Sequence, residues 1–238
     1  MQSNSSTARP PDKLMTFLGH GNVDAPLWFL GMEEGTHEDR MTLEENLAIR
    51  VKHYSQVMDL HRSQELLGWP IAERTRLTHV WYWMAKLTRG LVHGDADWLD
   101  TNKARDYVRT ALARETDDCF LAELLPLPKK SAQAWPEVYR QWWPTRSEYE
   151  RAVIPQRIEL LRESIARHRP RWIIAFGMEH AWAFERLLAP TNWAVIGKCR
   201  TGVLPRSSTR VAITPFFGNG AFGGHDAQQL LKSLREHS

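Results

Sequence analysis

The stretch LWFLGMEEG, residues 27–35, joins an apolar run to a turn that carries two adjacent carboxylates, Glu33 and Glu34. The apolar half is typical of a strand buried on both faces, as in a parallel sheet. Ligands of open α/β sheets bind just beyond the carboxyl ends of the strands. The glycines at 31 and 35 allow a ligand close to the backbone. The stretch therefore predicts a functional strand end, with a solvated surface turn as the alternative.

Apolar runs of the same character recur along the chain, each bounded by glycine, proline or charged residues, at residues 119–124, 172–176, 193–196 and 210–214. Helical patterns separate most of them, at residues 43–60, 75–88, 102–114, 151–167 and 178–188 and from Gly224 onward. Strands that alternate with helices predict a parallel sheet with helices on both faces. In the last helix, Asp226 is predicted as the N-cap, with Gln229 completing a capping box.

Length and composition fit one α/β domain over residues 14–238, since 238 residues with 42% hydrophobic content can bury a sizeable core. Residues 1–13 are polar and carry prolines, so we expect a disordered tail. Residues 43–114 are mostly of helical pattern, which predicts a helical insertion between the first and second strands.

Several classes of protein are disfavoured by what the chain lacks. Cys119 and Cys199 show no ligand spacing, and the histidines do not converge on a metal-binding pattern, so no metal or other cofactor is expected. No apolar run is long enough to cross a bilayer. These features favour a soluble, cytoplasmic monomer without membrane contact.

Charge and aromatic content are compatible with nucleic-acid binding. The formal net charge is +3, and several of the eleven tryptophans lie near arginines. Such pairs suit stacking on unpaired bases and contact with phosphates, although packing explains most tryptophans equally well. The loop FFGNGAFGG, residues 216–224, adds three phenylalanines among four glycines.

Three strand ends together resemble the uracil-DNA glycosylase superfamily. GMEEG, residues 31–35, resembles its first motif, which reads Gly-Met-Asn-Pro-Gly in the single-strand-selective monofunctional branch and carries aspartate at the third position in the main branch. CFLAELLPL, residues 119–127, resembles the strand whose asparagine reads uracil, and TPF, residues 214–216, stands where the family has His-Pro-Ser. Between them, RWIIAFG at residues 171–177 is similar to the family's third strand. The resemblance implies a three-layer α/β/α fold with a central four-stranded parallel sheet.

The resemblance also implies a monofunctional DNA glycosylase, which hydrolyses the N-glycosidic bond of a flipped-out base. Glu33 stands at the position of the water-positioning aspartate, where a carboxylate stabilises an oxocarbenium-like sugar. Glu34 is a second catalytic candidate of lower weight, with helix capping as its alternative. The implied base-binding residues are Gly31, Met32, Gly35, Glu123 and Thr214. No lysine occupies a motif position, so Schiff-base chemistry is not indicated.

Departures from the family pattern point to the kind of base. Glu123 replaces the uracil-reading asparagine, and an ionised glutamate only accepts hydrogen bonds. It therefore suits an exocyclic amino group such as cytosine N4, unless it serves only in a structural ion pair. Gly35 leaves room at pyrimidine C5, where the main branch places a tyrosine. Together they predict a cytosine-type base with a C5 substituent, as found in hypermodified phage DNA, and hence a role in anti-phage defence.

The histidine that stabilises the departing base is replaced by Thr214. The glycine-rich loop offers substitutes, because Asn219, His225 or backbone amides would be able to donate to the base. Its phenylalanines would be able to wedge into the duplex or stack on the flipped base, with packing under the loop as an equal alternative; they are Phe216, Phe217 and Phe222.

Two other functions remain open on the same residues. The first is a non-catalytic nucleic-acid-binding module, which the missing histidine and the two unusual glutamates favour. The second is a hydrolase of small-molecule N-glycosides that uses the same pocket. The DNA glycosylase is the preferred hypothesis.

Overall fold

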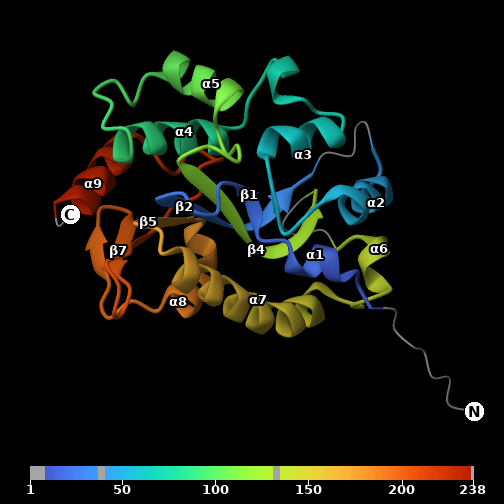
Figure 1. Ribbon diagram of the computed structural model, residues 1–238. Helices are drawn as coiled ribbons and strands as arrows, with labels where there is room; N and C mark the ends of the chain where they lie inside the picture. Colours follow the sequence, from blue (N-terminus) through green and yellow to red (C-terminus); the bar gives the residue numbers. More distant parts are fainter. Residues whose placement is uncertain (1–8, 37–40, 131–134, 237–238) are drawn as a thin grey trace, which may run out of the picture.

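The computed structural model describes residues 9–36, 41–130 and 135–236 and places helices on both faces of one mixed sheet (Figure 1). Within these residues the sheet has eight strands in the order β3-β1-β4-β2-β5-β8-β7-β6. The strands are β1 (Gly19–Gly21), β2 (Leu27–Gly35), β3 (Val57–Met58), β4 (Cys119–Lys129), β5 (Trp172–Phe176), β6 (Ala194–Ile196), β7 (Cys199–Val203) and β8 (Arg210–Thr214). The predicted α/β class is confirmed.

The predicted four-stranded parallel sheet is wrong as an account of the whole sheet. Strands β4, β2, β5 and β8 are mutually parallel, but β1 joins β4 and β7 joins β8 in antiparallel fashion. Of the added strands, β1, β3 and β7 have two to five residues, and none of them is an apolar run long enough to stand out. Residues 193–196 were predicted as a buried parallel strand, yet β6 is an antiparallel edge strand on which Val195 is 75% exposed.

Two helical layers enclose the sheet (Figure 1). The α-helices are α1 (Asp12–Thr16), α2 (Leu43–His53), α3 (Leu60–Leu66), α4 (His79–Leu91), α5 (Thr101–Thr110), α6 (Glu137–Arg140), α7 (Arg146–His168), α8 (Ala181–Leu188) and α9 (Gly224–Arg235), with 3₁₀ turns η1 (Ile71–Glu73) and η2 (Met178–His180). Helices α1, α7 and α8 pack on one face of the sheet, and α3, α4, α5 and α9 pack on the other.

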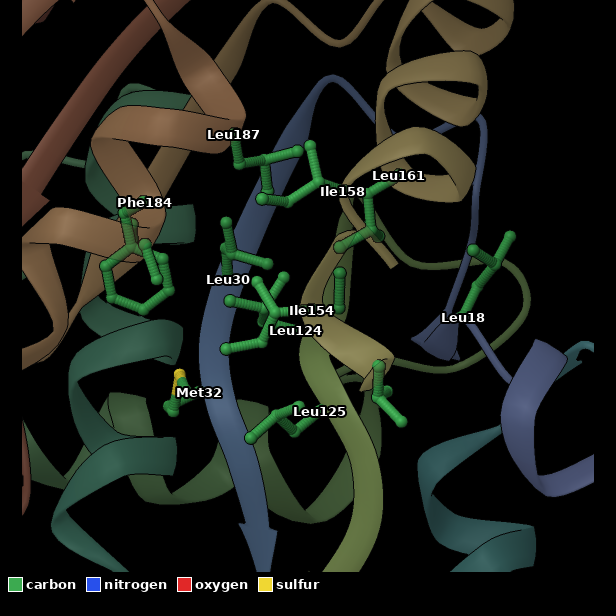
Figure 2. Packing of buried hydrophobic residues seen from close by; sticks show 14 of the residues in the cluster. Leu18, Leu30, Met32, Leu124, Leu125, Ile154, Ile158, Leu161, Phe184 and Leu187 are labelled. Atoms are coloured by element: carbon green, nitrogen blue, oxygen red, sulfur yellow. The ribbon is translucent and has the colours of Figure 1, made fainter. Parts of the chain in front are cut away.

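Side chains along the central strands alternate between the two layers, as the pleat of a strand requires. Leu30, Met32 and Leu124 belong to the core toward α7 and α8, where Figure 2 shows them together. Phe29 and Leu121 belong to the core toward α4, α5 and α9. This alternation decides which strand residues reach the α4 side, where the candidate site lies.

Several predicted boundaries differ from the structure. The helix predicted over residues 43–60 ends at His53, and the chain then forms β3 before α3 begins. Of the predicted disordered tail, residues 1–8 lie outside the described residues, and Asp12 begins α1. Gly223, not Asp226, is the N-cap of α9; the Asp226 carboxylate accepts from the Gly223 amide at 3.0 Å from inside the first turn. An acidic residue inside the first turn satisfies the same amide that a capping side chain would serve.

Candidate active site

A cavity of about 270 Å³ lies at the carboxyl ends of β2 and β4, on the α3 and α4 side of the sheet. The predicted residues that line it are Glu33, Glu34, Gly35, Glu123 and Phe216. Lining residues that the sequence did not reveal include His20, Asn46, Gln64, Trp69, Arg74 and Lys130. Strands at the centre of an α/β sheet place their polar ends at such an edge, which is the usual position of a ligand site.

A larger hollow of about 700 Å³ lies near the amino ends of β5 and β8, bordered by Arg162, Leu204 and Thr209. None of the described residues that line it carries a carboxylate. The glutamates predicted as catalytic residues line the smaller cavity instead.

Glu33 lies at the end of β2 with its side chain 11% exposed. Its Oε1 atom contacts Lys129 Nζ at 2.9 Å and accepts from both terminal nitrogens of Arg146 at 3.3 Å. Burial raises the pKa of Glu33 from 4.5 to about 7, and the Arg146 charge limits the rise. A carboxyl group with this pKa exchanges its proton near neutral pH, which is favourable for a general base that accepts a proton from water.

Glu34 points to a different partner. Its Oε2 atom lies 2.9 Å from Nη1 of Arg50, which is itself buried and donates to Asn46 Oδ1 at 2.6 Å. Burial raises the pKa of Glu34, but the charge of Arg50 and the hydrogen bond with it lower it more, so the net shift is downward. Glu34 is therefore an ionised partner of Arg50, which fits a supporting role better than proton transfer.

Glu123 is 6% exposed and lies opposite Gly31, its register partner on β2. A Cβ atom at Gly31 would come within 2.3 Å of Glu123 Oε2, so the glycine admits this carboxyl group. Oε2 has no hydrogen-bond partner among the described residues. Burial, together with the charges of Glu34 and Glu33, raises the pKa of Glu123 well above its ordinary value.

The structural ion pair considered for Glu123 is not found within the described part of the chain. The Arg157 guanidinium, whose charge acts on Glu123, donates instead to backbone oxygens, of Glu123 at 2.7 Å, Leu124 at 3.0 Å and Met15 at 3.1 Å. The carboxyl group of Glu123 is therefore available to a ligand in the cavity. Burial without a paired cation favours the neutral form of Glu123 and raises its pKa, contrary to the ionised form expected from the sequence.

His20 of β1 is a second buried group with an unpartnered polar atom in the cavity wall. Its Nε2 atom is hydrogen-bonded to Ser63 Oγ at 3.1 Å, and Ser63 is also hydrogen-bonded to the Tyr54 hydroxyl. Nδ1 has no partner among the described residues. Burial lowers the pKa of His20 to about 4, so the imidazole is neutral. β1 is too short to be recognised in the sequence, which is why His20 was missed.

One wall of the cavity combines a cation with aromatic rings. The Arg74 guanidinium lies 4.8 Å from the Trp81 ring centre and 5.6 Å from that of Trp69. Lys130 is exposed at the same cavity. Trp81 is thus paired with Arg74, whereas Arg89, on the same helix as Trp81, binds Asp95 in the loop after α4. Aromatic planes beside positive charge suit stacking on a base and contact with a phosphate.

Residues of the first motif lie in two places: Gly35 borders the cavity, whereas Met32 is buried in the core. Gly35 borders the cavity, and a Cβ atom added there would meet no atom within 4 Å. Gly31 makes room for Glu123. Met32 is buried in the core toward α7, where Figure 2 shows it, so its predicted contact with a base is wrong.

The third motif and the glycine-rich loop contribute less than predicted. Thr214 is buried, donates to backbone oxygens of Ala175 and Pro215, and is not a lining residue, so it does not serve base binding. Phe217 and Phe222 are core residues with ring centres 4.9 Å apart, which confirms the packing alternative. Of the loop residues, only Phe216 borders the cavity. Asn219 and His225 are exposed and lie away from it; the Asn219 side chain accepts from the Ala221 amide at 3.0 Å.

Titration of Glu33 in the free protein tests whether burial raises its pKa and whether Arg146 limits the rise. We expect its carboxyl carbon to titrate by NMR with a midpoint near pH 7, and Arg146→Gln to move the midpoint upward by removing a charge that lowers the pKa. Since folding raises this pKa, the stabilisation from Glu33 is complete below about pH 4 and is lost as the pH rises through about 7. A midpoint at the ordinary value of 4.5 would contradict the burial of Glu33.

Comparisons with known proteins supply no relative from which a function can be transferred. No protein-family model matches the chain, and no curated protein matches it. The described residues contain no group of three or more histidine, cysteine, aspartate or glutamate side chains placed to hold a metal ion. Among the helices of the same residues, none combines the length and apolar character needed to span a membrane.

Proposed function

We propose that this chain is a monofunctional DNA glycosylase that hydrolyses the N-glycosidic bond of an extruded, modified base. The observation that carries the proposal is the joint presence of Glu33 and Glu123 in the wall of one cavity beyond adjacent strand ends. One carboxyl group would act on water and the other on the base. A base must leave the duplex before its sugar bond can be reached, and a cavity of about 270 Å³ can receive a single extruded base.

Glu33 takes the part of general base in this mechanism. In its ionised form it accepts a proton from the attacking water and stabilises positive charge on the sugar as the bond to the base lengthens. Lys129 and Arg146 hold one carboxylate oxygen, which orients the side chain. The second oxygen has no such cation within the described residues and is suited to water.

The proposed substrate is a cytosine-type base with a C5 substituent. A neutral Glu123 offers one donor and one acceptor, which complements the N3 and N4 edge of cytosine. The same pair also complements uracil, so rejection of uracil does not follow from Glu123 alone. Room for a C5 group comes from Gly35, beside which the space is open. Bases of this kind occur in hypermodified phage DNA, which makes anti-phage defence the proposed biological role.

A panel of DNAs tests the proposal directly. Single- and double-stranded oligonucleotides that contain uracil, hypoxanthine, or modified and glycosylated cytosines are incubated with the protein and scored for alkali-sensitive sites. Alkali-sensitive sites at a C5-substituted cytosine are expected. DNA binding without any such site on the whole panel would favour the non-catalytic binding module instead.

Replacement of Gly35 by tyrosine tests the room at C5. We expect release of a C5-substituted base to fall at least about tenfold relative to the unsubstituted base, because the ring would occupy the open space. Gly35→Ala is the matched control and leaves the ratio unchanged, since its Cβ meets nothing within 4 Å. An equal effect of tyrosine on both substrates would show that the C5 group does not lie at residue 35.

A small-molecule N-glycoside hydrolase is the second candidate, and the modest cavity volume favours it, because a free nucleoside would suffice to fill the site. Salt distinguishes the two functions. Contacts with DNA phosphates make affinity fall steeply with salt concentration, whereas a neutral nucleoside imposes no such slope. Release of the base from free nucleoside as fast as from DNA, at a rate insensitive to salt, would favour the second candidate.

A further inference from the structure

Resting on the proposed function, we propose that Glu123 is the general acid of the reaction and protonates the departing base at the ring nitrogen N3 of a cytosine-type ring. This assigns a chemical step to the residue, beyond recognition of the base. It also fills the place of the histidine that the third motif lacks, since Thr214 is buried and donates to backbone oxygens away from the cavity.

The three carboxyl groups of the cavity differ in their partners, and this difference singles out Glu123. Glu33 is paired with Lys129 and Arg146, and Glu34 with Arg50. In the described residues Glu123 has no ion pair, and its Oε2 atom accepts and donates no hydrogen bond. A buried carboxyl group without a cation retains its proton, and an unpartnered buried oxygen favours a ligand that can accept it.

Groups that face Glu123 come from four elements. They are Glu33 and Glu34 of β2, Arg50 of α2, Arg157 of α7 and, across β4, His20 of β1. The two glutamates oppose ionisation of Glu123, and the two arginines favour it. Each arginine already has another partner, because Arg157 donates to backbone oxygens and Arg50 is paired with Glu34. The neutral His20 adds no charge at pH 7. The balance raises the pKa of Glu123, which favours the protonated form of the acid.

Bond cleavage and proton transfer to the base occur together in the proposed step. The bond from C1′ to N1 breaks with its electron pair moving into the base, and the Oε2–H bond of Glu123 breaks as N3–H forms. Water forms the new bond to C1′ and gives a proton to Glu33. The products are the free base and an abasic sugar, and transfer of the proton from Glu33 back to Glu123 through solvent restores both groups. One water molecule is consumed.

This role gives a reason for the base preference that hydrogen bonding alone does not provide. N3 of a cytosine-type ring carries a lone pair and can accept the proton, whereas N3 of uracil already carries hydrogen. Uracil would bind at Glu123 and still depart without protonation at N3. The acid therefore discriminates in the rate of bond cleavage and not in binding.

Glu123→Gln separates proton transfer from recognition, because the amide keeps one donor and one acceptor but cannot transfer a proton. For a C5-substituted cytosine we expect kcat to fall by about 10²–10⁴-fold with KM nearly unchanged, and the alkaline limb of the kcat profile to disappear. Release of 5-fluorouracil, whose anion departs readily, should fall less than about tenfold. Glu163→Gln, an exposed position on α7, is the matched control and should match the wild type.

A spectroscopic measurement tests the same residue without turnover. The infrared spectrum of the free protein at pH 7 should contain, besides the contribution of partly protonated Glu33, a neutral carboxyl band that Glu123→Gln removes and Glu33→Gln leaves in place. If the glutamine variant does not fold, Gly31→Ala serves instead. Its Cβ would approach Oε2 to 2.3 Å, so the carboxyl group must move and kcat should fall.

The outcomes separate the two proposals. An active wild type with unchanged kcat in Glu123→Gln overturns the acid role alone, as does a raised KM with unchanged kcat, which would leave recognition only. Absence of the infrared band also overturns the acid role. A wild type that releases no base from any DNA overturns the proposed function, and the acid role falls with it.

Discussion

Replacing Glu33 by glutamine is expected to slow base release by about 10²–10⁴-fold while DNA binding stays close to that of the wild type. The amide can neither accept a proton from water nor place negative charge beside the developing oxocarbenium sugar. Single-turnover measurement of abasic sites reports the chemical step, and fluorescence anisotropy with the same oligonucleotide reports binding. Unchanged release would remove Glu33 from the mechanism.

Glu150→Gln is the matched control for this variant. Glu150 shares Arg146 with Glu33, at 2.6 Å from the Arg146 Nε atom, but does not line the cavity. We expect its release rate to stay within about threefold of the wild type, since Glu150 does not line the cavity and Arg146 keeps its contact with Glu33. Glu33→Gln also removes the carboxylate that contacts Lys129, whose side chain is only 2% exposed. Thermal unfolding is therefore recorded to confirm that the assay temperature is below the melting point.

The second large effect concerns stability at the same cavity. Arg50→Met is expected to lower the free energy of unfolding by about 3–5 kcal/mol, because it leaves Glu34 as an uncompensated charge in a buried setting. The variant also loses the hydrogen bond from Arg50 to Asn46 and the contact of the guanidinium with the Tyr54 ring, 4.9 Å from its centre. Urea unfolding measured by circular dichroism gives the difference.

A double variant identifies the cause of this loss. Arg50→Met combined with Glu34→Gln leaves no unpaired charge, so part of the lost stability should return. Arg62→Met removes an exposed partner of Glu65 and should change stability by no more than about 0.5 kcal/mol. If Arg50→Met differs from the wild type as little as Arg62→Met does, the Arg50–Glu34 pair does not stabilise the fold.

The central strands could be predicted from the sequence because burial on both faces demands consecutive apolar residues. Strands β5 and β8 occupy the predicted ranges. Strand β2 begins at the predicted Leu27 but continues to Gly35, so the turn predicted to carry Glu33 and Glu34 is wrong. Strands β1, β3 and β7 could not be predicted, since none of them is an apolar run long enough to stand out. Strand β6 lies within the predicted run 193–196, but its antiparallel pairing at the edge was not predicted. Their pairing depends on contacts between segments far apart in the chain, such as β1 with β4.

The candidate site was predictable only where it belongs to strand ends. Glu33 and Glu123 could be identified because each directly follows apolar residues of a central strand. His20 and Arg74 reach the cavity from segments without a periodic pattern, so no local signal marks them. The protonation state of Glu123 was also beyond the sequence, because it depends on burial and on charges from other elements.

The close approach of Gly31 to Glu123 makes these two positions dependent on each other in evolution. A methyl group at 31 would collide with the end of the Glu123 side chain, which lies 2.3 Å from where it would stand. A shorter side chain at 123, such as asparagine, would vacate that space. Alanine at 31 should therefore leave the cavity undisturbed only after residue 123 has been shortened, so the order in which the two substitutions arise determines whether the side chain at 123 is displaced on the way.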